Sequence, residues 1–84
     1  MAKRDRLLWL VLRGGSDANI RFTDLCQLLL SLGFEERIRG SHHVFVRAGI
    51  DDLINLQKEG SKAKPYQVRQ VRKVLARYGL GRND

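Results

Sequence analysis

The chain has 84 residues, a net charge of +7 and a hydrophobic fraction of 43%. This length leaves room for one domain, and the composition is that of a folded protein rather than a disordered one. A single cysteine, Cys26, excludes an intramolecular disulfide and favours a reducing, cytoplasmic environment. The apolar run from Leu7 to Leu12 is too short to cross a bilayer and lacks a following cleavage site, so we interpret it as a helix rather than a signal peptide.

Helical spacing of apolar residues predicts two helices in the first part of the chain. The first covers residues 4–13 and ends at Gly14-Gly15; the second covers residues 22–32 and ends at Gly33. The turn-forming stretch "GGSDAN" lies between them. We therefore expect residues 1–21 to form an N-terminal helical extension and loop, and residues 22–84 to form the functional domain.

The periodicity changes after Gly33. The segments "FEERIR", "HHVFVR" and "DDLINLQ" are separated by short Gly-containing turns and predict three antiparallel strands. We expect "KEGSKAK" to be a flexible basic loop, and Pro65 to begin a last helix with an apolar stripe. The predicted fold is a two-layer α+β domain with a three-stranded antiparallel sheet and an additional N-terminal helix. Its αβββα part has the topology of double-stranded RNA-binding domains.

Positive charge is concentrated near the C-terminus. Seven basic residues and no acidic one lie between Lys62 and Arg82. Such a segment attracts polyanions, although it is also compatible with a solvated helix face. We interpret it as an RNA-binding surface. The candidates for RNA backbone contacts are Lys62, Lys64, Arg69, Arg72 and Lys73.

The two histidines, His42 and His43, are adjacent at the start of a predicted strand. Their side chains should point to opposite faces, so they cannot easily share a metal ion, and no recognised metal-ligand spacing or phosphate-binding loop is present in the sequence. We expect Cys26 to be a buried core residue, far along the chain from the histidines. RNA cleavage needs less apparatus, because the ribose 2′-hydroxyl is the nucleophile and imidazole, with an ordinary pKa near neutral, can transfer its proton. From these residues alone, a structural histidine in a non-catalytic RNA-binding module is the leading interpretation.

The stretches "LGFEERIRGSHHVFVR" and "GSKAKPYQVRQVRKVLARYGL" resemble the HicA family of bacterial toxins. The resemblance covers about residues 22–80, and the order and spacing of the motifs are more specific than any one of them. It implies a double-stranded-RNA-binding-like fold, RNA cleavage and a HicB-type antitoxin as protein partner. The family's catalytic histidine follows Gly-Ser, a position that His42 occupies here. The segment "RAGIDDLINLQ" departs from the family's "HPDG"-like turn, and residues 1–20 have no counterpart in its shortest members.

Together these observations predict the toxin component of a toxin–antitoxin system, an endoribonuclease that cleaves mRNA without a metal or cofactor. His42 would be the catalytic acid or base, with Ser41 and His43 in supporting positions. If Phe45 packs under the helices, His43 shares its face and His42 lies on the opposite face. A double-stranded RNA-binding module without activity is the alternative, and a domain that binds only an acidic protein partner is a third.

Overall fold

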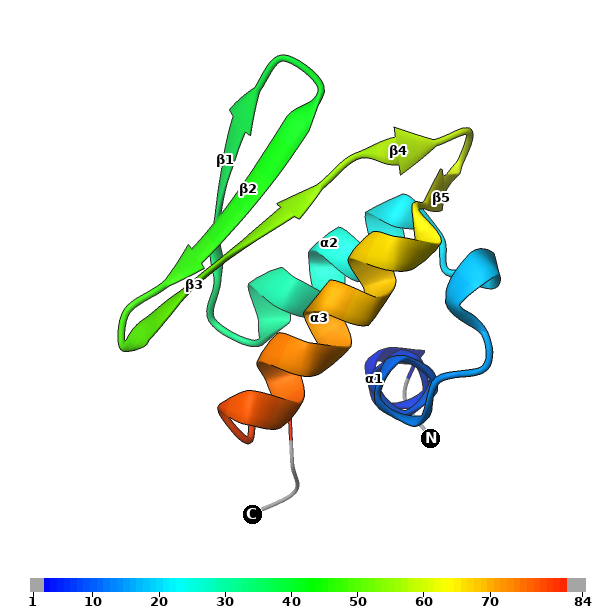
Figure 1. Ribbon diagram of the computed structural model, residues 1–84, viewed down its shortest axis with the longest axis horizontal. Coiled ribbons are helices and arrows are strands. Elements are labelled where there is room, and N and C mark those ends of the chain that lie inside the picture. Colours follow the sequence, from blue (N-terminus) through cyan, green and yellow to red (C-terminus); the bar gives the residue numbers. More distant parts are fainter. Residues whose placement is uncertain (1–2, 82–84) are drawn as a thin grey trace.

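The computed structural model describes residues 3–81. In chain order its elements are α1 (Lys3–Arg13), the short 3₁₀ helix η1 (Asp17–Asn19), α2 (Phe22–Ser31), β1 (Glu35–Arg39), β2 (His42–Arg47), β3 (Ile50–Leu56), β4 (Lys58–Glu59), β5 (Lys62–Ala63) and α3 (Pro65–Arg77). Strands β1, β2 and β3 form an antiparallel meander, and α2 and α3 lie together on one side of it (Figure 1). The predicted α+β class, the three helices and the three-stranded sheet are thereby confirmed. No described helix is both long and apolar enough to cross a membrane.

The prediction that "KEGSKAK" forms a flexible loop is wrong, because part of this segment forms a second, two-stranded sheet. Strands β4 and β5 pair across a turn at Gly60-Ser61. Backbone hydrogen bonds tie this hairpin to the segment before α2: Ala63 N–H donates to the Ile20 carbonyl at 2.9 Å, and Phe22 N–H donates to the Ser61 carbonyl at 3.1 Å. Polar composition suggested mobility, but the buried methyl group of Ala63 and these bonds hold the segment in place.

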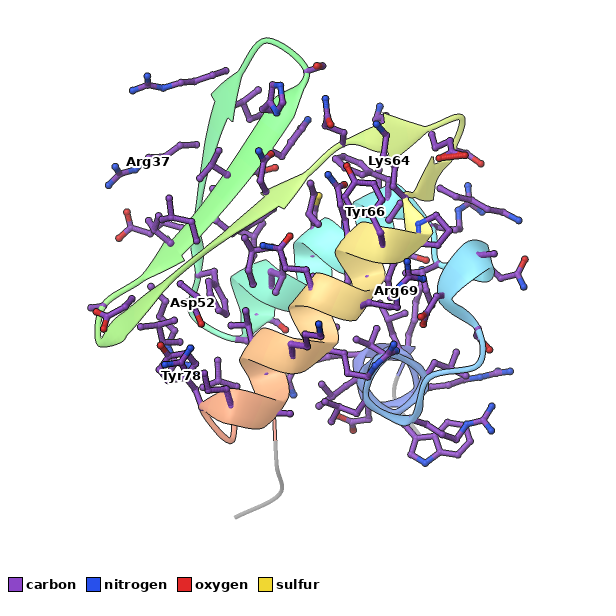
Figure 2. The ribbon with its side chains drawn as sticks, viewed as in Figure 1. Arg37, Asp52, Lys64, Tyr66, Arg69 and Tyr78 are labelled. Atoms are coloured by element: carbon purple, nitrogen blue, oxygen red, sulfur yellow. The ribbon has the colours of Figure 1, made fainter. Side chains whose placement is uncertain are left out.

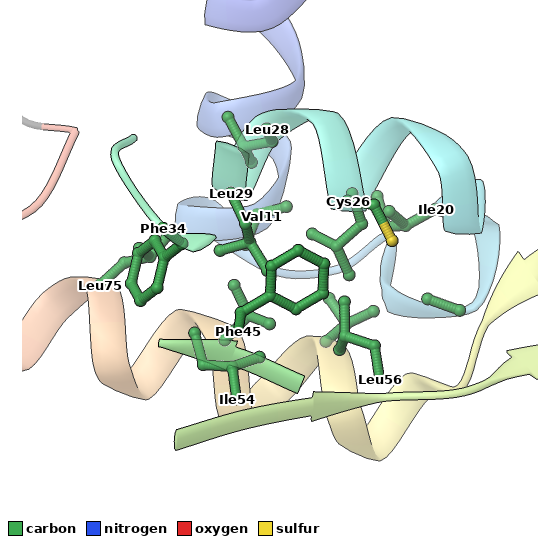
Figure 3. Packing of buried hydrophobic residues seen from close by; sticks show 14 of the residues in the cluster. Val11, Ile20, Cys26, Leu28, Leu29, Phe34, Phe45, Ile54, Leu56 and Leu75 are labelled. Atoms are coloured by element: carbon green, nitrogen blue, oxygen red, sulfur yellow. The ribbon is translucent and has the colours of Figure 1, made fainter. Parts of the chain in front are cut away.

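The core lies between the helical layer and one face of the sheet. Phe45 at the centre of β2 is fully buried, with Ile54 and Leu56 of β3 beside it (Figure 3). The helices contribute residues from both apolar stripes that the sequence predicted. The buried apolar residues of α2 and α3 are Phe22, Leu25, Cys26, Leu28, Leu29, Val68, Val71, Val74 and Leu75. A buried aromatic residue and its close-packed neighbours supply much of the stability of a domain this small.

The N-terminal helix belongs to the same packing unit as the rest of the chain. Leu8 and Val11 of α1 are buried in the common hydrophobic cluster, and Ile20 joins it from the loop. The helix packs on α2 and α3, away from the sheet (Figure 1). The predicted boundary between residues 21 and 22 therefore separates segments of sequence but not two hydrophobic cores.

An ion pair fixes the loop between α1 and α2 against α3. The Arg72 guanidinium donates two parallel hydrogen bonds to the Asp17 carboxylate, at 2.9 and 3.0 Å, and a third to the Val11 carbonyl at 3.1 Å. It also passes over Gly14, where a Cβ atom would lie 3.2 Å from the guanidinium and where φ is +78°. Glycine thus suits this position for both backbone conformation and space.

These bonds hold the pKa of Asp17 below its ordinary value of 3.8, chiefly through the hydrogen bonds from Arg72 and against the opposing effect of burial. We expect Asp17→Asn to lower the free energy of unfolding by about 1–2 kcal/mol at pH 7. Because the folded-state pKa is lowered, this contribution is present above about pH 4 and is lost as pH falls through the folded-state value.

Melting temperature measured by circular dichroism from pH 7 to pH 2 tests this expectation. The difference between parent and Asp17→Asn should narrow in acid, whereas Asp51→Asn, at an exposed position, should match the parent throughout. A difference that does not change with pH would contradict a role for the charged pair.

Candidate active site on the open face of the sheet

The two adjacent histidines lie on opposite faces of β2. His43 is half-buried on the face of Phe45, while His42 is exposed on the face that no helix covers. The burial of Phe45 confirms the predicted alternation, in which Val44 and Val46 share the face of His42. The imidazole predicted to be catalytic is therefore open to a large ligand.

Two arginines of β1 lie beside His42 on this open face. The strand register pairs Arg39 with His42 and Arg37 with Val44, and directly opposed side chains share a face with Cβ atoms roughly 4.5–5.5 Å apart. Figure 2 shows Arg37 pointing away from the helices. Because both arginines are exposed, the open face offers positive charge next to the imidazole.

A two-residue turn sets this arrangement. Gly40 has φ of +59° and occupies the first position of the Gly40-Ser41 loop, as a type II′ turn requires. A two-residue hairpin loop makes its flanking residues, Arg39 and His42, direct partners. Sequence reasoning missed both arginines, although the Gly-Ser turn itself contained the signal.

Asn55 of β3 is the polar neighbour of His42. Its Oδ1 lies 3.3 Å from His42 Nδ1, and its pairing with Val44 places it on the same face. When Nδ1 donates this hydrogen bond, Nε2 keeps its lone pair and faces solvent. In that tautomer Nε2 is the nitrogen that can accept a proton. Sequence reasoning also missed Asn55 as a neighbour of His42.

A chain of hydrogen bonds links Ser41 to the N-terminus of α3. Gln57 Nε2 donates to Ser41 Oγ at 3.4 Å, and Lys64 Nζ donates to Gln57 Oε1 at 3.5 Å. The backbone N–H of Gln57 donates to Oε1 of the buried Gln67 at a shorter 2.7 Å. Lys64, the N-cap residue of α3, is thereby held near the turn that precedes His42, and Tyr66, the second residue of the helix, is exposed close to it (Figure 2).

The other predicted RNA-contacting residues are dispersed. Lys62 is exposed in β5 and donates to Asn19 Oδ1 at 3.2 Å. Arg69 and Lys73 are exposed on α3, and Lys73 lines a cleft of about 270 Å³ together with Asp52 and Leu53 of β3. Arg72, by contrast, is half-buried and engaged with Asp17. Of the five predicted RNA-contacting residues, four are thus cations without a carboxylate partner among residues 3–81, and Arg72 has a structural role.

His43 forms a half-buried cluster on the helical face. Its Nδ1 lies 2.7 Å from Glu36 Oε2, and its ring meets Phe22 edge-on with centroids 4.8 Å apart. Cys26 of α2 lies beside this pair. Cys26 is thus far from His43 along the chain, as expected, but close to it in space. Burial, with a smaller effect of Glu36, raises the pKa of the Cys26 thiol to about 12. Cys26 is thus protonated at neutral pH and is not an activated nucleophile.

No protein-family model, curated protein sequence or solved structure matches this chain.

The two histidines should differ in their effect on stability. We expect His43→Ala to lower the free energy of unfolding by roughly 1–3 kcal/mol, since it removes packing on Phe22 and leaves Glu36 without its partner. His42→Ala should stay within about 0.5 kcal/mol of the parent, because its side chain is exposed. Urea unfolding of both variants at pH 7 tests this pair, and equal losses would contradict the assignment of faces to roles.

Proposed function

We propose that this protein is an RNA-cleaving toxin of the HicA type, with His42 as the catalytic residue. The observation that carries the proposal is the position of the His42 imidazole on the open face, next to Arg39 and hydrogen-bonded to Asn55. The site is an exposed surface rather than an enclosed pocket, and such a surface suits a polymer. Cellular mRNA as the substrate would place the protein in the cytoplasm.

The chemistry follows from the groups at this surface. His42 Nε2 accepts the proton of a ribose 2′-hydroxyl, whose oxygen then attacks the adjacent phosphorus. The bond to the 5′-oxygen breaks, that oxygen takes a proton from a solvent water, and the products are a 2′,3′-cyclic phosphate and a 5′-hydroxyl end. The His42 imidazolium then returns its proton to solvent. Arg37 and Arg39 would stabilise the negative charge that develops on the phosphoryl oxygens. No step of this route requires a metal.

The order of elements supports the same family. A helix ending in Leu-Gly-Phe, a Gly-Ser-His turn that opens a strand, and a basic last helix follow one another here as in HicA proteins. Apart from the β4–β5 hairpin between β3 and α3, the order α2–β1–β2–β3–α3 is that of double-stranded-RNA-binding-like domains. In this proposal a HicB-type antitoxin would cover the open face and contact the exposed Arg37 and Arg39.

A binding module without catalytic activity is the second candidate. The exposed cations on α3 and β5, Lys62, Arg69 and Lys73, favour it because they would contact phosphates whether or not His42 reacts. Arg72 is left out of this surface because its guanidinium already binds Asp17.

We expect His42→Ala to reduce the rate of RNA cleavage by roughly a hundredfold to ten-thousandfold, since a positioned acid–base group contributes that much. Single-turnover cleavage of a long unstructured RNA in chelator measures it. His43→Gln is the matched control and should keep most of the rate, as its side chain lies on the other face.

Three results separate the functional classes. Cleavage that disappears with His42→Ala supports the toxin, and binding without cleavage supports the module. If the protein neither binds nor cleaves RNA, the remaining class is a domain that recognises only a protein partner. A His42→Ala protein that cleaves like the parent would refute the catalytic assignment.

The arginines of β1 provide a second test. Replacing Arg37 and Arg39 with glutamine should weaken RNA binding and reduce the slope of log K against log salt by roughly 0.7 for each phosphate that the variant no longer neutralises. The matched control replaces two exposed arginines of α1, Arg6 and Arg13, which lie away from the sheet. Equal effects of the two double variants in fluorescence titrations would show that net charge, and not the open face, binds RNA.

A further inference from the structure

Three side chains with metal-binding atoms meet on the helical face of the sheet, away from the proposed catalytic surface. They are Cys26 of α2, Glu36 of β1 and His43 of β2, and their ligand atoms all lie within 4.8 Å of one another. Each comes from a different element, so the tertiary fold alone brings them together. None of them transfers a proton or contacts a phosphate in the proposed RNA cleavage.

We propose that Cys26, Glu36 and His43 form a zinc-binding site. Thiolate sulfur, imidazole nitrogen and carboxylate oxygen are the three donor types of protein zinc sites. A soft sulfur ligand disfavours Mg²⁺ and Ca²⁺, which prefer oxygen alone. Three protein ligands leave the fourth position of the tetrahedron to water.

The geometry requires only small movements. Zinc–ligand distances of about 2.0–2.3 Å put the ligand atoms of a tetrahedral site roughly 3.3–3.7 Å apart. His43 Nδ1 and Glu36 Oε2 are 2.7 Å apart, so the ion would take the place of the proton that they share and move them slightly apart. The Cys26 sulfur would approach by about 1 Å, which side-chain rotation supplies.

Access and charge also fit a cation. The side chains of His43 and Glu36 are 21% and 22% exposed, which gives an entry path, whereas Cys26 closes the inner side. A zinc ion with one thiolate and one carboxylate is electrically neutral, so the half-buried site carries no uncompensated charge.

Binding would join α2 to both strands of the β1–β2 hairpin. The hairpin carries His42, Arg37 and Arg39 on its other face, so the ion would stiffen the base of the open surface without touching it. The proposal does not depend on RNA cleavage, because the ligands and their spacing are the same in any functional class.

Cobalt(II) is the probe, since a tetrahedral Co²⁺ site with a thiolate ligand shows a near-ultraviolet charge-transfer band and intense visible bands. We expect one Co²⁺ per chain in tag-free protein, with displacement of the ion by Zn²⁺. The chain has one cysteine, so the charge-transfer band in the parent protein by itself identifies Cys26, even where a variant fails to fold.

Variants assign the remaining ligands. Cys26→Ser should remove the band, and His43→Gln and Glu36→Gln should each weaken Zn²⁺ affinity roughly tenfold to a hundredfold or more. The control is His42→Ala, which deletes the adjacent imidazole on the opposite face and should leave affinity within about twofold of the parent's. At a zinc concentration about 100 times Kd, the parent should melt roughly 10–20 °C higher.

Three outcomes would overturn the zinc site. They are no saturable binding, binding without the thiolate band, and a half-integral stoichiometry that indicates ligands from two chains. Loss of binding in His42→Ala with retention in His43→Gln would assign the metal to the open face instead and would equally refute it.

Discussion

The burial of Phe45 is the constraint on which the rest of this structure depends. Side chains of a strand alternate between its two faces. Burying the large ring of Phe45 under α2 and α3 therefore determines the face on which each of the remaining β2 side chains lies. A shift by one residue would expose Phe45 and bury Val44, at a cost of about 1.5–3 kcal/mol for the lost apolar burial alone. The register that places His42 beside Arg39 and His43 beside Glu36 therefore follows from a packing requirement and not from the histidines.

Much of this could be predicted from the sequence because it is local. The Gly-Ser turn, the alternation around Phe45 and the apolar stripe of α3 depend on neighbours within a few residues, and the structure confirms each of them. The β4–β5 hairpin was missed because its stability comes from hydrogen bonds to residues 20–22, about forty positions earlier in the chain. Polar composition is a poor guide where the backbone finds a distant partner.

The candidate site likewise contains residues that the sequence could predict and residues that it could not. His42 is predictable from the motif, and Arg39 would have been predictable from the turn length, because both lie within one hairpin. Asn55 reaches His42 only through the β2–β3 register, whose irregularity between Phe45 and Arg47 no sequence pattern indicates. Cys26 and His43 come close together only because α2 packs on the sheet. Long-range proximity of this kind cannot be deduced from spacing along the chain.

Arg72 shows why counting charges overstates a binding surface. It belongs to the basic C-terminal segment, yet its guanidinium forms two bonds to Asp17 and one to a backbone carbonyl, so a phosphate would have to compete with a preorganised carboxylate. Arg37 and Arg39 lie outside that segment and come from a strand that also carries two glutamates, so segment composition hides them. In space both lie on the strand next to His42, the one imidazole on the uncovered face. Which cations of the basic run come near His42 is thus decided by the fold: Lys64 is held beside the turn that precedes His42, whereas Arg72 is bound to Asp17.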